Sequence, residues 1–339
     1  MHHPEVICIS RTDSIGDVIL TLPVAAALKK TFPGVRIIFL GREYTRPIVN
    51  ACVHLDEFLE VNDFYNNGFA SVSQKPDCIL HVFPVKKIAW KAKQLGIPLR
   101  IGTAGRWYHW FTCNKRVQFS RRKSDLHEAQ LNLKLLQPFQ IKTDYSLQEL
   151  ASLIGLEKTE QLKPEFAALL NKDKYKLILH PRSQGSAREW SQQHFAELVN
   201  RLDTEKFQIF ISGTAADKAF LQPLPDAVKG KVTDITGAMS LSQFISFIKQ
   251  CDGLVANSTG PLHIAAALGR DALGIYPPMR PIHPGRWAPL GPKAKVFVLD
   301  KECSGCRKGG TCHCINAILP EAISEELCKR ATADLHSKS

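Results

Sequence analysis

Two polar turns, one in each half of the chain, carry the residues best suited to chemistry. Ser14-Ile-Gly-Asp17 follows the apolar run Val6–Ile9, and Asn257-Ser-Thr-Gly260 follows the apolar run Gly253–Ala256. Each pattern predicts a strand, a tight glycine turn and a helix, whose first turn exposes unpaired N–H groups and a partial positive charge. Such a turn suits a phosphate or a carboxylate. One half could therefore hold an acceptor and the other a phosphorylated donor, with a cleft between them.

In the first turn, Gly16 lets the backbone approach a ligand closely, and Asp17 follows it in the first helical turn. Asp17 could point into the cleft from there, or it could be a helix residue that the helix dipole favours. Asp13 is a rival carboxylate that could cap the helix instead. The turn lacks the G-x-G-x-x-G pattern of dinucleotide binding, and no cofactor is expected.

Two further polar loops follow apolar runs in the second half. The loop His180–Trp190 contains Arg182, Ser183 and Arg188, and the forked donors of arginine suit a pyrophosphate. The alternative is a surface loop with no ligand. Asp217 follows the next apolar run and its glycine, where a carboxylate could hydrogen-bond a ribose.

The second turn could form a phosphate nest. The hydroxyls of Ser258 and Thr259 and the N–H groups from Gly260 onward can all donate to an anion. His263 lies one turn further and could touch the same ligand, although a lone histidine is more often packed in a core.

Apolar runs alternate with helical patterns along the whole chain, which predicts two doubly wound α/β domains with parallel sheets. A chain of 339 residues also fits two domains of about 150 residues better than one core. Helices are predicted over Val18–Thr31 and over Leu126–Phe139, the latter closed by Pro138. The predicted boundaries are 1–160 for the first domain, 161–174 for a linker, 175–318 for the second domain and 319–339 for a C-terminal helix and tail.

A basic segment supplies most of the net charge of +12. Between Lys75 and Lys123 the sequence has twelve lysines and arginines against one acid, Asp77. The aromatic residues interleaved with them are Trp90, Trp107, Tyr108, Trp110 and Phe111. This density favours an anionic partner over an ordinary solvated face: nucleic acid, an anionic membrane surface or a phosphorylated glycolipid.

Nine of the ten cysteines fall into two groups. Those in or near apolar runs are predicted to be buried thiols: Cys8, Cys52, Cys78, Cys113 and Cys251. Those with C-x2-C-x5-C-x-C spacing could clip a zinc ion or could be packed thiols, and no metal is assigned to them: Cys303, Cys306, Cys312 and Cys314. No apolar run reaches the roughly 20 residues that span a bilayer, and the N-terminus lacks a signal-peptide core, so a cytoplasmic protein is expected.

Taken together and in order, these motifs resemble glycosyltransferase family 9, the lipopolysaccharide heptosyltransferases. The resemblance covers nearly the whole chain. It rests on S-I-G-D-V-I-L-T-L-P, R-I-G at Arg100–Gly102, His127-Glu128, H-P-R-S…R-E-W, S-G-T-A-A-D, D-I-T-G and N-S-T-G-P-L-H-I-A-A-A-L-G. It implies the GT-B architecture, in which two Rossmann-like domains face a cleft, with the acceptor on the first domain and a nucleotide-sugar donor on the second.

The resemblance also implies roles for single residues. Asp17 falls where the family has its catalytic base, and Arg188 where it usually has a lysine near the donor phosphates. Asp217 matches a glutamate that binds the donor ribose, and Ser258 stands where many members have an aspartate. The other donor-binding residues expected are Arg182, Ser183, Met239, Thr259, Gly260 and His263. The acceptor-binding residues expected are Asp13, Gly16, Arg100, Arg121, Arg122 and Lys123.

The reaction implied is an inverting, metal-independent transfer of a heptose from ADP-heptose to a lipopolysaccharide core acceptor of the Kdo-lipid A type. Asp17 would take the proton of the acceptor hydroxyl, and a partly closed, drier cleft would raise its pKa towards that use. The acceptor's phosphates and carboxylates would draw the basic segment to the anionic inner face of the membrane. The alternatives are a GT-B transferase or epimerase that uses a UDP- or GDP-linked sugar, and a non-catalytic basic module that binds anions. Nucleic acid is not expected as a partner, because no nucleic-acid motif is present.

Overall fold

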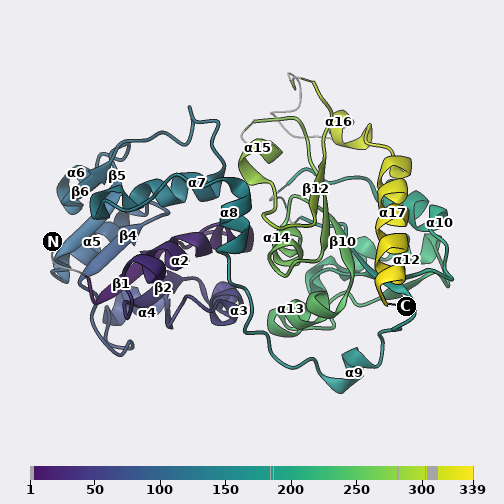
Figure 1. The fold of residues 1–339 in the computed structure, drawn as a ribbon, viewed down its shortest axis with the longest axis horizontal. Helices are drawn as coiled ribbons and strands as arrows, with labels where there is room; N and C mark the ends of the chain where they lie inside the picture. The colour runs from purple at the N-terminus through teal and green to yellow at the C-terminus, as the bar shows by residue number, and fades with distance from the viewer. Residues whose placement is uncertain are drawn as a thin grey trace. The chain divides into compact units, whose positions relative to one another are not determined.

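The computed structural model describes residues 4–183, 185, 187–280, 282–301, 303 and 312–338. The chain divides into two compact units, Met1–Lys158 and Thr159–Ser339. Each unit contains a six-stranded sheet in which every pair of neighbouring strands is parallel, with helices packed against it (Figure 1). The prediction of an α/β chain with two Rossmann-like domains is therefore confirmed.

The sheet of the first unit has the strand order β3-β2-β1-β4-β5-β6. Its strands are β1 Val6–Ser10, β2 Arg36–Gly41, β3 Glu57–Glu60, β4 Cys78–His81, β5 Leu99–Thr103 and β6 Lys115–Val117. The connecting helices are α1 Ile15–Ile19, α2 Leu22–Thr31, η1 Glu43–Thr45, α3 Arg46–Ala51, α4 Val61–Asn67, α5 Lys86–Gln94, α6 His109–Thr112, α7 Glu128–Leu133, η2 Lys134–Phe139 and α8 Leu147–Ser152. The order of the strands reverses between β1 and β4. In open α/β sheets, ligands bind at the carboxyl ends of the strands beside such a reversal.

The helix predicted over Val18–Thr31 is in fact two helices, α1 and α2. Pro23 explains the break, because it has no N–H to donate to the carbonyl four residues earlier. The Thr21 hydroxyl donates to the backbone carbonyl of Asp17 at 2.8 Å and fixes the step between the two helices. The helix predicted over Leu126–Phe139 likewise continues past α7 as the 3-10 helix η2, which contains Pro138.

The sheet of the second unit has the order β12-β11-β10-β7-β8-β9, so its reversal lies between β7 and β10. Its strands are β7 Tyr175–His180, β8 Phe207–Ile211, β9 Val232–Asp234, β10 Gly253–Asn257, β11 Asp271–Ile275 and β12 Ala294–Phe297. The helices are α9 Pro164–Ala167, α10 Gln192–Arg201, η3 Ala215–Asp217, α11 Lys218–Leu221, α12 Pro223–Ala227, α13 Leu241–Gln250, α14 Gly260–Ala267, α15 Pro284–Trp287, α16 His313–Asn316 and α17 Pro320–Lys338.

Each sheet is buried against its own helices. In the first unit, Val6 and Cys8 of β1 pack with Phe64 of α4 and Ile88 of α5. In the second unit, α17 packs against α10 (Figure 1), and its apolar residues join the core around Tyr175. The thiols predicted to be buried are buried: Cys8, Cys52, Cys78, Cys113 and Cys251. In the part of the chain that the structure describes, no helix is both long enough and apolar enough to cross a bilayer.

Candidate active site

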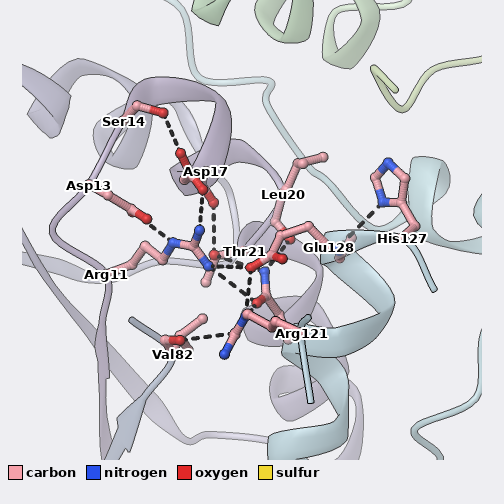
Figure 2. Close-up of polar contacts among 12 residues, drawn as sticks. Arg11, Asp13, Ser14, Asp17, Leu20, Thr21, Val82, Arg121, His127 and Glu128 are labelled. Atoms are coloured by element: carbon pink, nitrogen blue, oxygen red, sulfur yellow. Dashed lines mark hydrogen bonds and ion pairs between the residues drawn. The ribbon is translucent and has the colours of Figure 1, made fainter. Parts of the chain in front are cut away.

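Asp17 lies in α1, directly after β1, at the reversal of the first sheet. Its two carboxylate oxygens accept hydrogen bonds from different side chains, one from the Arg11 guanidinium and the other from the Ser14 hydroxyl (Figure 2). The Asp17 side chain keeps 15% of its surface exposed, so a ligand can still reach it. The carboxylate is therefore both oriented and accessible, as a proton acceptor must be.

Arg11 is the centre of this arrangement, and only 2% of its side chain is exposed. Besides Asp17, its guanidinium donates to Asp13 Oδ1 at 2.7 Å and to Glu128 Oε1 at 3.0 Å. Burial by itself lowers the pKa of a guanidinium, but the charges of Asp13, Asp17 and Glu128 outweigh it and raise the pKa of Arg11. Arg11 thus stays charged and binds three carboxylates at once.

Glu128 and Asn132 support Arg11 from α7, more than a hundred residues along the chain. The Glu128 side chain is 1% exposed, and its Oε1 also accepts from Arg121 Nε at 3.0 Å. The Asn132 amide oxygen accepts from Arg11 at 3.3 Å and from Arg121 at 3.0 Å, while its nitrogen donates to the Leu20 carbonyl at 3.1 Å. These bonds connect α7 to the step between α1 and α2 (Figure 2).

Asp13 does not cap the helix, because Ser14 is the N-cap residue and the Asp13 carboxylate pairs with Arg11. The Asp13 side chain is 21% exposed, and burial raises the pKa of its carboxyl to about 6, although the charge of Arg11 opposes this. The backbone carbonyl of Asp13 accepts a hydrogen bond from the Tyr44 hydroxyl at 2.6 Å. Gly16 is buried in α1, one residue before Asp17.

The basic residues expected to hold an acceptor are not gathered in one place. Arg100 donates to the backbone carbonyls of Thr112, at 2.7 Å, and Ile97, so it braces the segments around β5. Arg121 contacts Glu128, Asn132 and the Val82 carbonyl, so it belongs to the support of Asp17. Arg122 and Lys123 are exposed.

In the second unit, Asn257 joins the two strands at the reversal. It is fully buried, its amide nitrogen donates to the Pro181 carbonyl at 2.7 Å, and its oxygen accepts from the Trp190 N–H at 2.9 Å. Asn257 therefore holds both ends of the loop after β7 beside the turn at Ser258 that follows β10. The two loops singled out in the sequence are thereby brought together.

Within the loop after β7, Glu189 binds the residues expected to meet a diphosphate. It accepts from Arg182 at 2.7 Å and from the Ser183 N–H at 2.7 Å and hydroxyl at 2.9 Å. The Arg182 guanidinium also lies over the Phe220 ring, 3.9 Å from its centroid. Arg188 is partly exposed in the same loop.

The carboxylate of Asp217 is bound by neighbouring residues of its own unit. Only 3% of the residue is exposed, and its carboxylate accepts from the Thr214 N–H at 2.9 Å and hydroxyl at 2.7 Å. Its other oxygen lies 3.5 Å from Arg182 Nε. In this arrangement Asp217 fixes the loop after β8 and the direction of Arg182.

Thr259 is the N-cap of α14, and its side chain makes no capping bond. Its hydroxyl is buried with no hydrogen-bond partner among the described residues, which costs about 1–3 kcal/mol unless a ligand satisfies it. Ser258 and Gly260 flank it and are partly exposed, and His263 is buried one turn further into α14. Met239 is partly exposed on the segment between β9 and α13.

The cysteine cluster lies only in part within the described residues. Cys312 and Cys314 are buried, Cys303 packs at the edge of the second core, and Cys306 lies outside the described residues. Among the residues that are described, no group of three or more histidine, cysteine or acidic side chains could hold a metal ion.

Three residues of these sites were not predicted from the sequence: Arg11, Asn132 and, as a link between loops, Asn257. Glu128 and Glu189 appeared only as members of family motifs. Arg11 had a usable signal, since a charged residue directly after an apolar strand lies at the carboxyl edge of a parallel sheet. Asn132 had none, because it stands inside a helical pattern where a polar residue normally faces solvent.

Comparison with known proteins gives the family of this chain. The family model of glycosyltransferase family 9 (heptosyltransferase) matches residues 73–314, which is more than half of the chain. A candidate glycosyltransferase of Haemophilus influenzae is 26% identical over 326 residues, covering 90% of this chain and 90% of that protein. Lipopolysaccharide heptosyltransferase 2 of Salmonella typhimurium is 31% identical over 151 residues, but that match covers only 42% of each chain.

The fold has solved counterparts. The structure of the Escherichia coli ADP-heptose lipopolysaccharide heptosyltransferase II superposes with a TM-score of 0.75 at 20% identity, covering 97% of this chain and 99% of that one. The Escherichia coli heptosyltransferase WaaC with ADP gives a TM-score of 0.71 at 16% identity, covering 96% and 99%. At these identities the similarity shows the shared GT-B fold. Together with the family match, it establishes that the chain belongs to glycosyltransferase family 9 (heptosyltransferase) and is a glycosyltransferase.

Proposed function

We propose that this glycosyltransferase transfers a heptose from ADP-heptose to the core of a lipopolysaccharide acceptor. The observation that carries the proposal is the carboxylate of Asp17, which is held by Arg11 and Ser14 at the strand reversal and remains partly exposed. Relatives named lipopolysaccharide heptosyltransferase 2 support the sugar and the acceptor, and the two solved structures whose names include ADP-heptose or ADP support the nucleotide.

The chemistry proposed is a single displacement with inversion. The acceptor hydroxyl gives its proton to Asp17 while its oxygen forms a bond to the anomeric carbon of the donor. The bond from that carbon to the phosphate oxygen breaks, and the nucleoside diphosphate leaves with the electron pair. The transition state resembles an oxocarbenium ion, as in glycoside hydrolysis. Arg11 acts as a positioning residue that keeps the accepting oxygen of Asp17 in place.

The leaving diphosphate gains negative charge. We propose that the second unit stabilises this charge without a metal ion. The α14 N-terminus at Thr259 and Gly260 offers N–H groups, a partial positive charge and a hydroxyl that is otherwise unsatisfied. Arg182 and Arg188 supply full charges from the neighbouring loop. Ser258, Ser183, Met239 and His263 would line the same nucleotide site. We propose that Asp217 acts on the donor through Arg182 rather than by direct contact.

For the acceptor, we propose an anionic glycolipid that contacts the first unit at the edge where Asp17 lies. Arg122 and Lys123 are exposed on the segment after β6 and suit phosphates or carboxylates. Arg121 contributes indirectly, because it already pairs with the buried Glu128. Neutralising Arg122 and Lys123 together should therefore raise the acceptor KM with little effect on folding.

The donor is tested first by thermal shift with ADP, UDP, GDP and CMP, without added metal. ADP should stabilise the protein selectively, and Thr259→Val should remove most of that shift. The matched control is Thr233→Val, the same change on β9, which should respond like the wild type. Stabilisation by UDP or GDP would keep the transferase and overturn the ADP-linked donor. No shift with any nucleotide would overturn the donor site.

A further inference from the structure

Three large aromatic side chains stand in solvent on the first unit. The exposed fractions are 61% for Trp107, 59% for Trp110 and 62% for Phe111. We call these three residues the aromatic patch. They belong to α6 and the turn before it, where Tyr108 and His109 are buried and anchor the segment. Monomeric soluble proteins seldom expose such clusters, and when they do the cluster usually marks an interaction surface.

The rings are held in position rather than left loose. Trp107 packs edge-on against Phe111 with ring centroids 6.4 Å apart. The Trp110 indole N–H donates to the Ala104 carbonyl at 3.2 Å. A surface whose rings are already fixed loses less side-chain entropy when it binds.

Cations surround the aromatic patch. Lys86 Nζ lies 4.9 Å from the ring centroid of Trp107, and the Arg116 guanidinium lies 4.5 Å from that of Trp110. Arg106 and Lys115 are also exposed on the adjoining segments. Among the ion pairs formed by the described residues, none involves these four side chains. Their charge is therefore available to an external anion.

We propose that the aromatic patch and its surrounding cations dock this unit on an anionic membrane surface. Tryptophan favours the boundary between lipid headgroups and acyl chains, because its ring is apolar and its N–H is polar. Lysine and arginine at the rim attract the anionic headgroups. Exposed indole rings beside cations that form no ion pair among the described residues fit this partner better than a second protein surface, since the cations would repel another copy of the same patch.

The position of the aromatic patch also fits the proposed acceptor, and this part of the argument rests on the proposed function. The patch directly follows β5, and α6 packs beside β5 and α5 (Figure 1). In the sheet, β5 is separated from β1 by one strand, β4. Since parallel strands lie about 4.8 Å apart, the carboxyl ends of β1 and β5 are about 10 Å apart along the same edge. A glycolipid in the docked membrane would therefore present its sugars near Asp17.

The experiment measures flotation with vesicles of phosphatidylglycerol and phosphatidylethanolamine, and with vesicles of phosphatidylcholine alone. No donor or acceptor is added, so the result does not depend on transferase activity. The wild type should bind the anionic vesicles and not the zwitterionic ones. The triple variant Trp107→Ala/Trp110→Ala/Phe111→Ala and the double variant Lys86→Gln/Arg106→Gln should each bind roughly tenfold more weakly. The matched controls Leu319→Ala and Lys172→Gln/Lys229→Gln change exposed side chains of the second unit and should bind like the wild type.

Insertion of the aromatic patch into the membrane is measured separately. Vesicles with brominated acyl chains should quench the tryptophan fluorescence of the wild type and not that of the triple variant. An ADP thermal shift on the triple variant should match the wild type, which shows that the variant is folded and separates this proposal from the donor site. The proposal is overturned by absence of vesicle binding, by binding that the triple variant retains, by stronger binding to duplex DNA at the same salt, or by a wild-type dimer that the triple variant loses.

Discussion

Arg11 and Glu128 are 117 positions apart in the sequence, yet the Arg11 guanidinium lies 3.0 Å from the Glu128 carboxylate. Both side chains are almost fully buried, at 2% and 1% exposed. A charge pair in such surroundings is held firmly, because breaking it leaves one charge buried without compensation. The direction of Asp17, the candidate base, therefore depends on a residue from α7.

Replacing Glu128 with Gln should lower kcat about tenfold while leaving the donor KM unchanged, because Arg11 loses the charge that fixes its direction and Asp17 loses its alignment. Steady-state kinetics measure both constants. Glu43→Gln is the matched control, since the ion pair of Glu43 with Arg46 is exposed. An unchanged kcat for Glu128→Gln would show that Asp17 does not depend on this support.

Asp17→Asn should lower turnover by roughly 10²–10⁴, the range for loss of a general base. Its unfolding midpoint should stay close to that of the wild type, because the asparagine oxygen can still accept from Arg11 while its amide nitrogen can donate to the Ser14 hydroxyl oxygen. Asp13→Asn serves as the comparison, since Asp13 pairs with the same guanidinium. A larger loss of turnover for Asp13→Asn than for Asp17→Asn would transfer the role of base to Asp13.

The titration of Asp13 should make the free energy of unfolding depend on pH. Burial raises the pKa of its carboxyl from the ordinary value of 3.8 to about 6 in the folded protein. Between these two pH values the folded protein keeps a proton on Asp13 that the unfolded chain has released. The contribution of Asp13 to stability is therefore present at low pH and is lost as pH rises from about 4 to 6, by at most about 1.4 kcal/mol per pH unit. Urea unfolding at several pH values should show Asp13→Asn gaining roughly 1–3 kcal/mol over the wild type across this window. If the unfolding free energies of Asp13→Asn and the wild type changed in parallel with pH, that result would contradict the burial of an ionised Asp13.

His81, the last residue of β4, should make stability depend on pH in the opposite direction. Burial lowers the pKa of His81 to about 3, with smaller effects from His109 and Arg100. The unfolded chain takes up a proton near the ordinary value of 6.5, so the contribution of His81 is complete above that pH and is lost as pH falls towards 3.

His81→Leu tests this directly. Both ring nitrogens of His81 are buried without a hydrogen-bond partner among the described residues, so the substitution should add about 1–2 kcal/mol at neutral pH. It should also remove part of the acid-induced loss of stability. Urea unfolding at neutral and acid pH measures both effects, and a variant less stable than the wild type at neutral pH would indicate that the His81 ring packs better than leucine can.

The positions of Asp17 and Thr259 could be predicted from sequence, because both depend on short local patterns of an apolar strand, a glycine and a helix. The break between α1 and α2 could also be predicted from the sequence, since Pro23 cannot donate a backbone hydrogen bond. The ion pair between Arg121 and Glu128 could not be predicted in this way. The place of Arg121 in a dense basic segment predicted contact with an acceptor, and that contact stays a prediction. Composition gives the charge of a segment and not the direction in which one side chain points.

The sequence by itself determined two doubly wound domains, the strand ends that carry the polar turns and the basic, aromatic segment, because these depend on periodicity and on neighbours within a few residues. The tertiary structure decided which charges meet. Packing of α7 brings Glu128 to the Arg11 guanidinium that also binds Asp17, and the pairing of β7 with β10 brings Asn257 to both ends of the loop after β7. Such pairs are set by the packing of distant elements against one sheet, and no local pattern encodes that packing.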